Sequence, residues 1–233
     1  MSMRQAIHYK LIGIAAAAAL IAGCATQEAP KPGEFSGYLG NYSDMKEVSG
    51  EGLGTLFRWA SPKLNPSNYS AVMIPPVQYY PKAEPTAQVS QETLDSIRNY
   101  STETLRRAAG EKVRVVDSPG RGVAKIQAAI TGVKPAKEGL HAYQYVPIAF
   151  VVTMAKRGVS GDPEEAKIVA EVMVTDSVSG EVLGKVVRVG TGKQLAAATG
   201  GTEKVITLDD VKPIFDNWAQ MTTENLPKFV KGK

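Results

Sequence analysis

The single cysteine of this 233-residue chain, Cys24, constrains the fold more than any other residue, because one cysteine cannot form an intrachain disulfide. It follows a basic head with Arg4 and Lys10 and an uncharged run from Leu11 to Ala22. A bilayer-spanning helix needs about 20 apolar residues, so this run is too short to span and is typical of a secretory signal peptide. The chain beyond the run must therefore be stabilised by a hydrophobic core.

The residues around Cys24 refine this prediction. Leu20-Ile21-Ala22-Gly23-Cys24 resembles the bacterial lipobox, in which the cysteine is diacylated on sulfur, freed by cleavage and acylated on its new amino group. We therefore predict cleavage between Gly23 and Cys24 and lipidation of Cys24, with a diacylglyceryl group and a palmitate-like acyl chain as the membrane anchor. The alternative is an ordinary secretory signal with an incidental cysteine.

Anchoring by acyl chains follows from simple energetics. Each buried methylene contributes about 0.8 kcal/mol, so three chains would hold the protein stably on a membrane without spanning it. Ala25 stands where the Gram-negative inner-membrane retention signal, by resemblance, carries Asp. The expected location is the outer membrane, on its periplasmic face.

Three segments follow from these features. Residues 1–23 form the lipoprotein signal peptide, residues 24–34 a lipidated, proline-containing flexible tether, and residues 35–233 a single domain. Removal of Arg4 and Lys10 leaves 25 basic residues (27 − 2) against 23 acidic ones. This small excess, without a basic cluster, argues against nucleic-acid binding.

The pattern of hydrophobic residues predicts the elements of the domain. Helices are expected over residues 91–109, ended by Gly110, and from Asp209 to Pro227, with Pro213 in the first turn. Strands are expected over residues 71–74, 112–117, 123–131 and 146–154, and a hairpin over 167–190 turns at Asp176 to Gly180. The predicted fold class is α+β, a mostly antiparallel sheet of about five or six strands with two helices packed on one face.

Aromatic residues concentrate in the segment from 35 to 80, which we expect to be irregular and to wrap the domain in extended form. Packing in the core is one interpretation of these side chains. The other is an exposed strip that docks an envelope protein partner, because aromatic side chains supply rigid contact area. The candidate partner-binding residues are Phe35, Tyr38, Tyr42, Phe57 and Trp59.

Few residues favour catalysis. His141 is the only histidine left after signal cleavage, and no Gly-x-Ser-x-Gly motif accompanies it. Gly192-Lys193 suggests a phosphate loop, but Gln194 stands where Ser or Thr would bind magnesium. We predict a protein that is not an enzyme and has no metal or cofactor. The alternative is a cell-envelope hydrolase or small-molecule binder with its site in the loops at 136–145 or 190–204.

Several stretches are similar to a known family. They are SGYLGNYSDM at 36–45, NYSAVMIPPVQ at 68–78, AAITGV at 128–133, AEVMVTDSVSGEVLG at 170–184 and FDNWA at 215–219. In this order they resemble the Gram-negative lipoprotein family catalogued as domain of unknown function 3313. The resemblance supports the architecture and the membrane location, and it implies no activity or catalytic residue.

Overall fold

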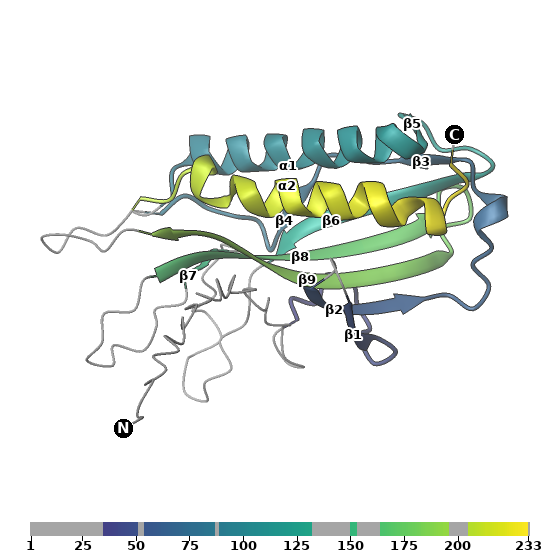
Figure 1. Ribbon diagram of the computed structural model, residues 1–233, viewed down its shortest axis with the longest axis horizontal. Coiled ribbons are helices and arrows are strands. Elements are labelled where there is room, and N and C mark those ends of the chain that lie inside the picture. The colour runs from purple at the N-terminus through teal and green to yellow at the C-terminus, as the bar shows by residue number, and fades with distance from the viewer. Residues whose placement is uncertain are drawn as a thin grey trace, which may run out of the picture.

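The computed structural model describes residues 35–50, 54–86, 89–131, 150–152, 164–195 and 205–232. The predicted signal peptide, the Gly23–Cys24 cleavage site and the tether lie outside the described residues, and so do His141 and the loop at 136–145. In the part that is described, one sheet and two long helices form two layers (Figure 1).

Nine strands make up the sheet within the described residues. In chain order they are β1 (Lys46–Gly50), β2 (Gly54–Ala60), β3 (Ala71–Met73), β4 (Gln78–Tyr80), β5 (Arg114–Val116), β6 (Val123–Thr131), β7 (Phe150–Val152), β8 (Glu164–Asp176) and β9 (Val182–Leu195). The order across the sheet is β1-β2-β9-β8-β6-β3-β5, with β4 beside β6 and β7 beside β8. Five pairings are antiparallel, whereas β3 runs parallel to β5 and β6, and β4 runs parallel to β6.

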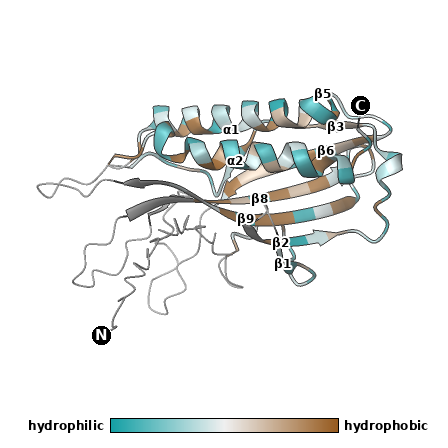
Figure 2. Ribbon diagram, viewed as in Figure 1, coloured by the Kyte–Doolittle hydropathy of each residue, from teal (hydrophilic) through white to brown (hydrophobic). Residues whose placement is uncertain are grey.

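Both helices lie on one face of this sheet, side by side: α1 (Gln91–Lys112) and α2 (Leu208–Asn225) (Figure 1). The Ser90 hydroxyl accepts the N–H of Thr93 and so caps α1. At α2, Thr207 and Asp210 form a reciprocal capping box. Figure 2 shows hydrophobic strand residues beneath the helices and hydrophilic residues on the outer sides of both helices.

Alternation along the strands creates two different sheet faces. On the helix face, the core forms two clusters, one around Ile97, Ile168 and Phe215 and the other around Val72, Ile126 and Leu183. On the opposite face, residues 35–45, which we call the strap, pack over β2, β8 and β9. Leu39, Met45, Phe57, Val169, Val187 and Val189 are the buried members of this strap-face cluster.

The predicted fold class is confirmed: an α+β domain with two helices on one face of the sheet. The strand count was too low because the aromatic segment is irregular only in part: residues 35–45 wrap the sheet without regular structure, but the segment also supplies the β1–β2 hairpin and β4. The turn at Asp176 to Gly180 is confirmed, and Gly180 adopts φ +77°, a conformation that glycine permits at little cost.

Three boundaries differ from expectation. Helix α1 continues through Gly110 to Lys112, because Val113 is the first extended residue. Pro213 falls in the second turn of α2, not the first, since the helix begins at Leu208. Residues 190–195 were expected to be loop, but they continue β9 in antiparallel register with β8. Backbone pairing with β8 therefore makes this glycine-containing stretch a strand and not a loop.

Candidate functional site

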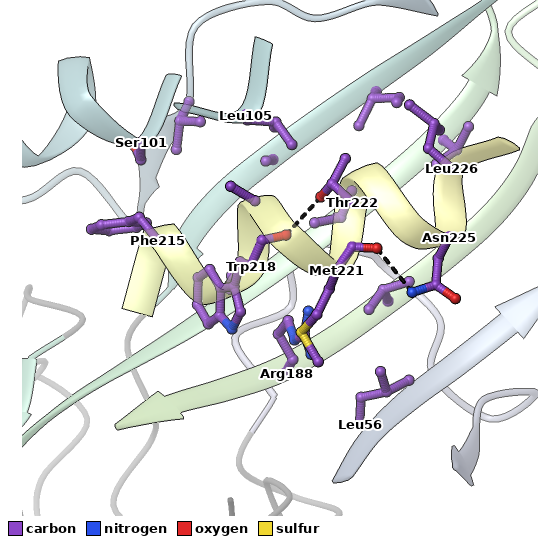
Figure 3. A pocket seen from close by; sticks show the side chains of 18 of the residues that line it. Leu56, Ser101, Leu105, Arg188, Phe215, Trp218, Met221, Thr222, Asn225 and Leu226 are labelled. Carbon is purple, nitrogen blue, oxygen red and sulfur yellow. Dashed lines mark hydrogen bonds between the residues drawn. The ribbon is translucent and has the colours of Figure 1, made fainter. Parts of the chain in front are cut away.

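A cavity of about 250 Å³ lies between α2 and the sheet, where the two helix-face clusters meet. Its floor is made of aliphatic side chains from the central strands, and its roof comes from α2 (Figure 3). The floor residues include Ile126, Ala128, Ile130, Ala170, Val172, Val174 and Val186, and the roof residues include Phe215, Trp218, Met221, Thr222 and Asn225. Concave, largely apolar sites with a few polar groups are typical of ligand pockets.

Gly190 lets α2 pack closely against β9 beside the cavity. A Cβ built on Gly190 would lie 2.2 Å from Cγ2 of Ile214 and 2.8 Å from the indole ring of Trp218. Only a residue without a side chain lets the first half of α2 approach β9 this closely. Two residues earlier on the same face of β9 stands Arg188, whose side chain lines the cavity.

Arg188 places a guanidinium group at this cavity. The guanidinium lies over the Trp218 ring, 5.6 Å from its centroid, and Nη2 lies 2.9 Å from the sulfur of Met221. Burial lowers the pKa of Arg188 to about 10, which still leaves the side chain protonated at neutral pH. The cavity therefore has a permanent positive charge on its wall.

The indole of Trp218 supplies a further donor. Its Nε1 is buried and has no hydrogen-bond partner among the described residues. Buried indole N–H groups ordinarily find an acceptor. In Figure 3 the nitrogen lies on the side of the ring that faces Arg188. Both donors therefore lie at the same end of the cavity.

A smaller cavity of about 120 Å³ adjoins the first. The two cavities share six described lining residues: Arg58, Ile126, Val174, Val186, Leu226 and Phe229. Arg58 on β2 is exposed, and its guanidinium lies 6.0 Å from the centroid of the Phe229 ring. Arg58 thus marks the side from which solvent reaches the cavities.

The strap face has a buried charged residue of its own, Glu171 on β8, whose exposed fraction is 0%. Its carboxylate accepts hydrogen bonds from the Ser36 N–H at 2.9 Å, the Tyr42 hydroxyl at 2.5 Å and the Thr131 hydroxyl at 3.2 Å. Two of these three donors belong to the strap. Glu171 therefore fastens the strap to the sheet.

Tyr42 completes this arrangement. Its hydroxyl oxygen accepts the N–H groups of Gly37 and Leu39, each at 3.0 Å, while its proton goes to Glu171. Burial, and then the hydrogen bond to Glu171, raise the pKa of Tyr42 to about 12. The ring stacks on Phe35 with centroids 4.5 Å apart. One side chain thus closes the strap loop and attaches it to β8.

The five candidate partner-binding residues come together on the strap face. Phe57 is buried, and Phe35, Tyr38, Tyr42 and Trp59 are half-buried and packed against the same cluster. The core interpretation is therefore correct for the packing of these side chains. Their binding of an envelope partner stays a prediction.

Sequence reasoning missed the charged residues of both faces. Arg188 and Glu171 each interrupt an apolar strand, in VVRVG and in VAEVMV. A charge flanked on both sides by apolar residues in a strand is a usable signal where the strand is central, because such a side chain must then be paired or must face a site. Trp218 gave no comparable signal, since its position on an amphipathic helix is that of a core residue.

Within the described ranges, no three His, Cys, Asp or Glu side chains are grouped so that they could hold a metal ion. Among the same residues, no helix combines the length and the hydrophobicity of a membrane span. The described residues that line the larger cavity include no histidine, cysteine or carboxylate.

Comparison with known proteins identifies the family of this chain. A family model described as "Protein of unknown function (DUF3313)" matches residues 34–222. The chain belongs to the DUF3313 family. The predicted family resemblance is confirmed, and the match spans the strap, the sheet and most of α2.

Relatives of this DUF3313 protein are named as lipoproteins. The chain is 32% identical over 203 residues to an uncharacterized lipoprotein, YdcL, of Escherichia coli K12, covering 87% of this chain and 89% of the relative. The same values hold for YdcL of Escherichia coli O157:H7.

Solved structures show lower similarity to the DUF3313 chain. PelC from Paraburkholderia phytofirmans, a dodecamer in its crystals, is 14% identical with a TM-score of 0.36, covering 76% of this chain and 98% of PelC. XCC0632 from Xanthomonas campestris is 7% identical with a TM-score of 0.35, covering 70% and 87%.

Proposed function

We propose that this protein is a non-enzymatic binding lipoprotein of the outer membrane, held on the periplasmic face by acyl chains on Cys24, and that the cavity beneath α2 is its binding site. The main support for this proposal is the composition of the cavity. It combines an apolar floor with a cation and, at the same end, an indole N–H that has no hydrogen-bond partner among the described residues. The lipobox and the naming of YdcL as a lipoprotein support the anchor.

Photolabelling of the full lipidated chain in its native membranes tests the binding site. The probe is decane bearing a diazirine, and mass spectrometry locates the attached label. We expect label on peptides that line the cavity, those of β6, β8 and α2. Label confined to other surfaces of the protein would contradict the proposed site.

A matched pair of variants sharpens this test. Ala170 lies on the cavity floor and is 6% exposed, so Ala170→Leu extends a side chain into the ligand volume. Val178, in the β8–β9 turn, is 69% exposed, so Val178→Leu adds apolar volume away from the cavity. Label in the cavity should fall several-fold in Ala170→Leu and stay unchanged in Val178→Leu.

The anchor has a separate test. Cys24→Ser should leave an unlipidated, uncleaved precursor at the inner membrane, detected by its size and by membrane fractionation. A variant processed to normal size and released as a soluble protein would instead assign the cleavage to an ordinary signal peptidase.

An envelope protein partner remains part of the proposal, with the strap face as its docking surface. Trp59 and Tyr38 are half-buried there, and the exposed ring of Tyr80 lies 5.4 Å from the Tyr38 ring. In-cell crosslinking from position 59 should capture one reproducible envelope protein. Equal capture from the exposed residue Glu47, used as a control on β1, would remove this part of the proposal.

The enzyme alternative is tested with His141, which lies outside the described residues. We expect His141→Ala to leave the deletion phenotype complemented and the protein level unchanged. Loss of complementation at a normal protein level would favour a hydrolase with its site at 136–145.

A further inference from the structure

The indole of Trp218 distinguishes the larger cavity from an ordinary packing defect. Its nitrogen is buried, and no described residue accepts a hydrogen bond from it. We infer that the cavity takes a single acyl chain whose carbonyl oxygen accepts the Trp218 N–H, with the hydrocarbon along the floor of β6 and β8. This inference rests on the proposed function of the cavity as the binding site and names the class of ligand.

The indole ring is held in one orientation by its neighbours. It packs edge-on against Phe215, with centroids 5.8 Å apart, and the Arg188 guanidinium lies 5.6 Å from its centroid. It also lies so close to Gly190 that a Cβ built there would be 2.8 Å from the ring. A ring packed this closely has little freedom to turn toward another acceptor, so an acceptor must come to the nitrogen.

The other uncharged polar groups of the described lining already donate within the protein. The Ser101 and Thr222 hydroxyls and the Asn225 side-chain amide each donate to a backbone carbonyl oxygen at 2.9 Å. The Trp218 N–H is therefore the uncharged polar group of the described lining that lacks a hydrogen bond altogether. Leaving a buried donor unsatisfied is costly, so this position favours a ligand oxygen.

The floor decides the chemistry of the remainder of the ligand. Ile126, Val172 and Val174 line the cavity from the central strands, and Leu105 lines it from α1. These aliphatic side chains offer no hydrogen-bond partner, so the hydroxyls of a sugar or the amides of a peptide would lose their hydration without compensation. The floor therefore favours a hydrocarbon chain.

The size of the cavity limits the number of chains. Engineered apolar cavities of about 150 Å³ bind benzene, whereas sites for drug-sized ligands run from about 300 to 1,000 Å³. The volume of about 250 Å³ lies between these values. The cavity therefore suits one hydrocarbon chain and not the pair of chains of a phospholipid.

The lining residues place the chain along α2. From Trp218 to Asn225, the last residue of α2, the helix axis rises about 10 Å at about 1.5 Å per residue. The adjoining smaller cavity continues the apolar lining to Leu226 and Val230. Because Trp218 as a whole is half-buried, the carbonyl end of the ligand lies near the surface. The chain therefore runs from Trp218 toward Val230.

Competition photolabelling tests the inference on the full lipidated chain in its membranes. The label is methyl decanoate with a diazirine near the end of its chain, and the competitors are methyl decanoate and dodecane, which match in length. A methyl ester carries no charge, so the comparison measures the acceptor alone. We expect methyl decanoate to displace the cavity label about tenfold more effectively than dodecane, which corresponds to about 1.4 kcal/mol.

Variants assign the preference to its residue. Trp218→Phe keeps an aromatic ring and removes the N–H, so the preference for the ester should disappear. Gln220→Met removes an amide from the exposed side of the same helix and, as the matched control, should keep the preference. The partitioning of each competitor into the membrane does not depend on the variant, so a change between variants reports the protein. Thermal unfolding of each variant verifies that it is folded.

A second probe tests the orientation of the ligand without any substitution. It carries the diazirine near the carbonyl instead of at the chain end, and tandem mass spectrometry locates both labels. The chain-end probe should label residues around Leu226 and Val230, and the carbonyl-end probe should label residues around Trp218. Labels at the same residues from both probes would overturn the orientation.

The outcomes separate the two proposals. Cavity label that the ester and the alkane displace equally would keep the binding site and overturn the carbonyl acceptor. Label that never reaches the cavity peptides would overturn both. A preference that persists in folded Trp218→Phe would overturn the role of Trp218.

Discussion

The two faces of the sheet hold buried charges in contrasting ways. Glu171 and Arg188 lie on adjacent strands, where Glu171 pairs in register with Val187, and their side chains point to opposite faces. The carboxylate on the strap face accepts three hydrogen bonds from the chain itself. The guanidinium on the helix face borders a cavity. One charge thus holds the strap to the sheet, and the other lies in the lining of a cavity.

This comparison teaches that burial alone does not identify a functional charge. Each side chain is expensive to bury without compensation. On the strap face the compensation comes from residues 129 and 135 positions away in the chain, Tyr42 and Ser36. On the helix face the guanidinium lies over the Trp218 ring and close to the sulfur of Met221. The described neighbours of the two charges are therefore the informative difference.

The largest effect is expected when the strap-face charge is removed. Glu171→Ala leaves the Ser36 N–H and the Tyr42 hydroxyl without their acceptor and should lower the free energy of unfolding by about 3 kcal/mol or more. Urea unfolding followed by Trp59 fluorescence measures this. The exposed Glu47→Ala is the matched control and should change stability by less than about 0.5 kcal/mol. Equal stability of Glu171→Ala and wild type would contradict the assigned role.

The next effect concerns the contact that brings α2 to the sheet. Gly190→Ala places a Cβ within 2.2 Å of Ile214 and should destabilise the protein by about 1–3 kcal/mol through overpacking. Gly184→Ala, on the same strand, meets the Trp59 carbonyl oxygen at 3.4 Å and should cost little. Thermal unfolding of the pair compares them directly, and equal losses would refute the close-approach argument.

The attachment of the strap through Tyr42 can be tested by the pH dependence of stability. The pKa of Tyr42 is raised from 10.0 to about 12, so its contribution to stability is complete below pH 10 and is lost as the pH rises from 10 to 12. Tyr42→Phe should lower stability at neutral pH by about 1–2 kcal/mol and show a shallower decline over that range. Tyr80→Phe, at an exposed ring, is the control. An unchanged decline in Tyr42→Phe would assign the alkaline loss to other groups.

The smallest effect is expected on the cavity floor. Ala170→Leu fills empty apolar volume and should leave stability unchanged or raise it by up to about 1 kcal/mol. Ala109→Leu enlarges a fully buried alanine in the second helix-face cluster and should cost about 1–3 kcal/mol. Calorimetric unfolding distinguishes the two, and a comparable loss in Ala170→Leu would mean that the floor is already filled.

Much of the fold was predictable because its signals are local. Ser90 at the start of α1, the aspartates at the start of α2 and the glycine turn after β8 each act within a few residues. The β1–β2 hairpin was missed, since glycines at 50, 52 and 54 obscure the strands that flank them. Pairing with β9, which holds β2 in the sheet, is a long-range contact that no local pattern contains.

The candidate site was less predictable. Phe35, Tyr38, Tyr42, Phe57 and Trp59 were selected for their aromatic rings and proved to form one cluster. Arg58, Arg188 and Trp218 were not selected. The charge at Arg188 becomes informative only once its strand is known to be central, and Trp218 occupies a position typical of a core residue on an amphipathic helix. Only the position of α2 shows which face of β9 borders the cavity.

By itself, then, the sequence determined the helices, most strands, the family and the expected anchor at Cys24, because caps, turns, periodicity and a motif are written in neighbouring residues. The tertiary structure alone decided that Glu171 lies under the strap and Arg188 beside a cavity. The physical reason is alternation: neighbouring residues of a strand point to opposite faces. The strap face is covered by residues more than a hundred positions away in the chain, and the helix face near Arg188 by α2, 33 positions away at Met221.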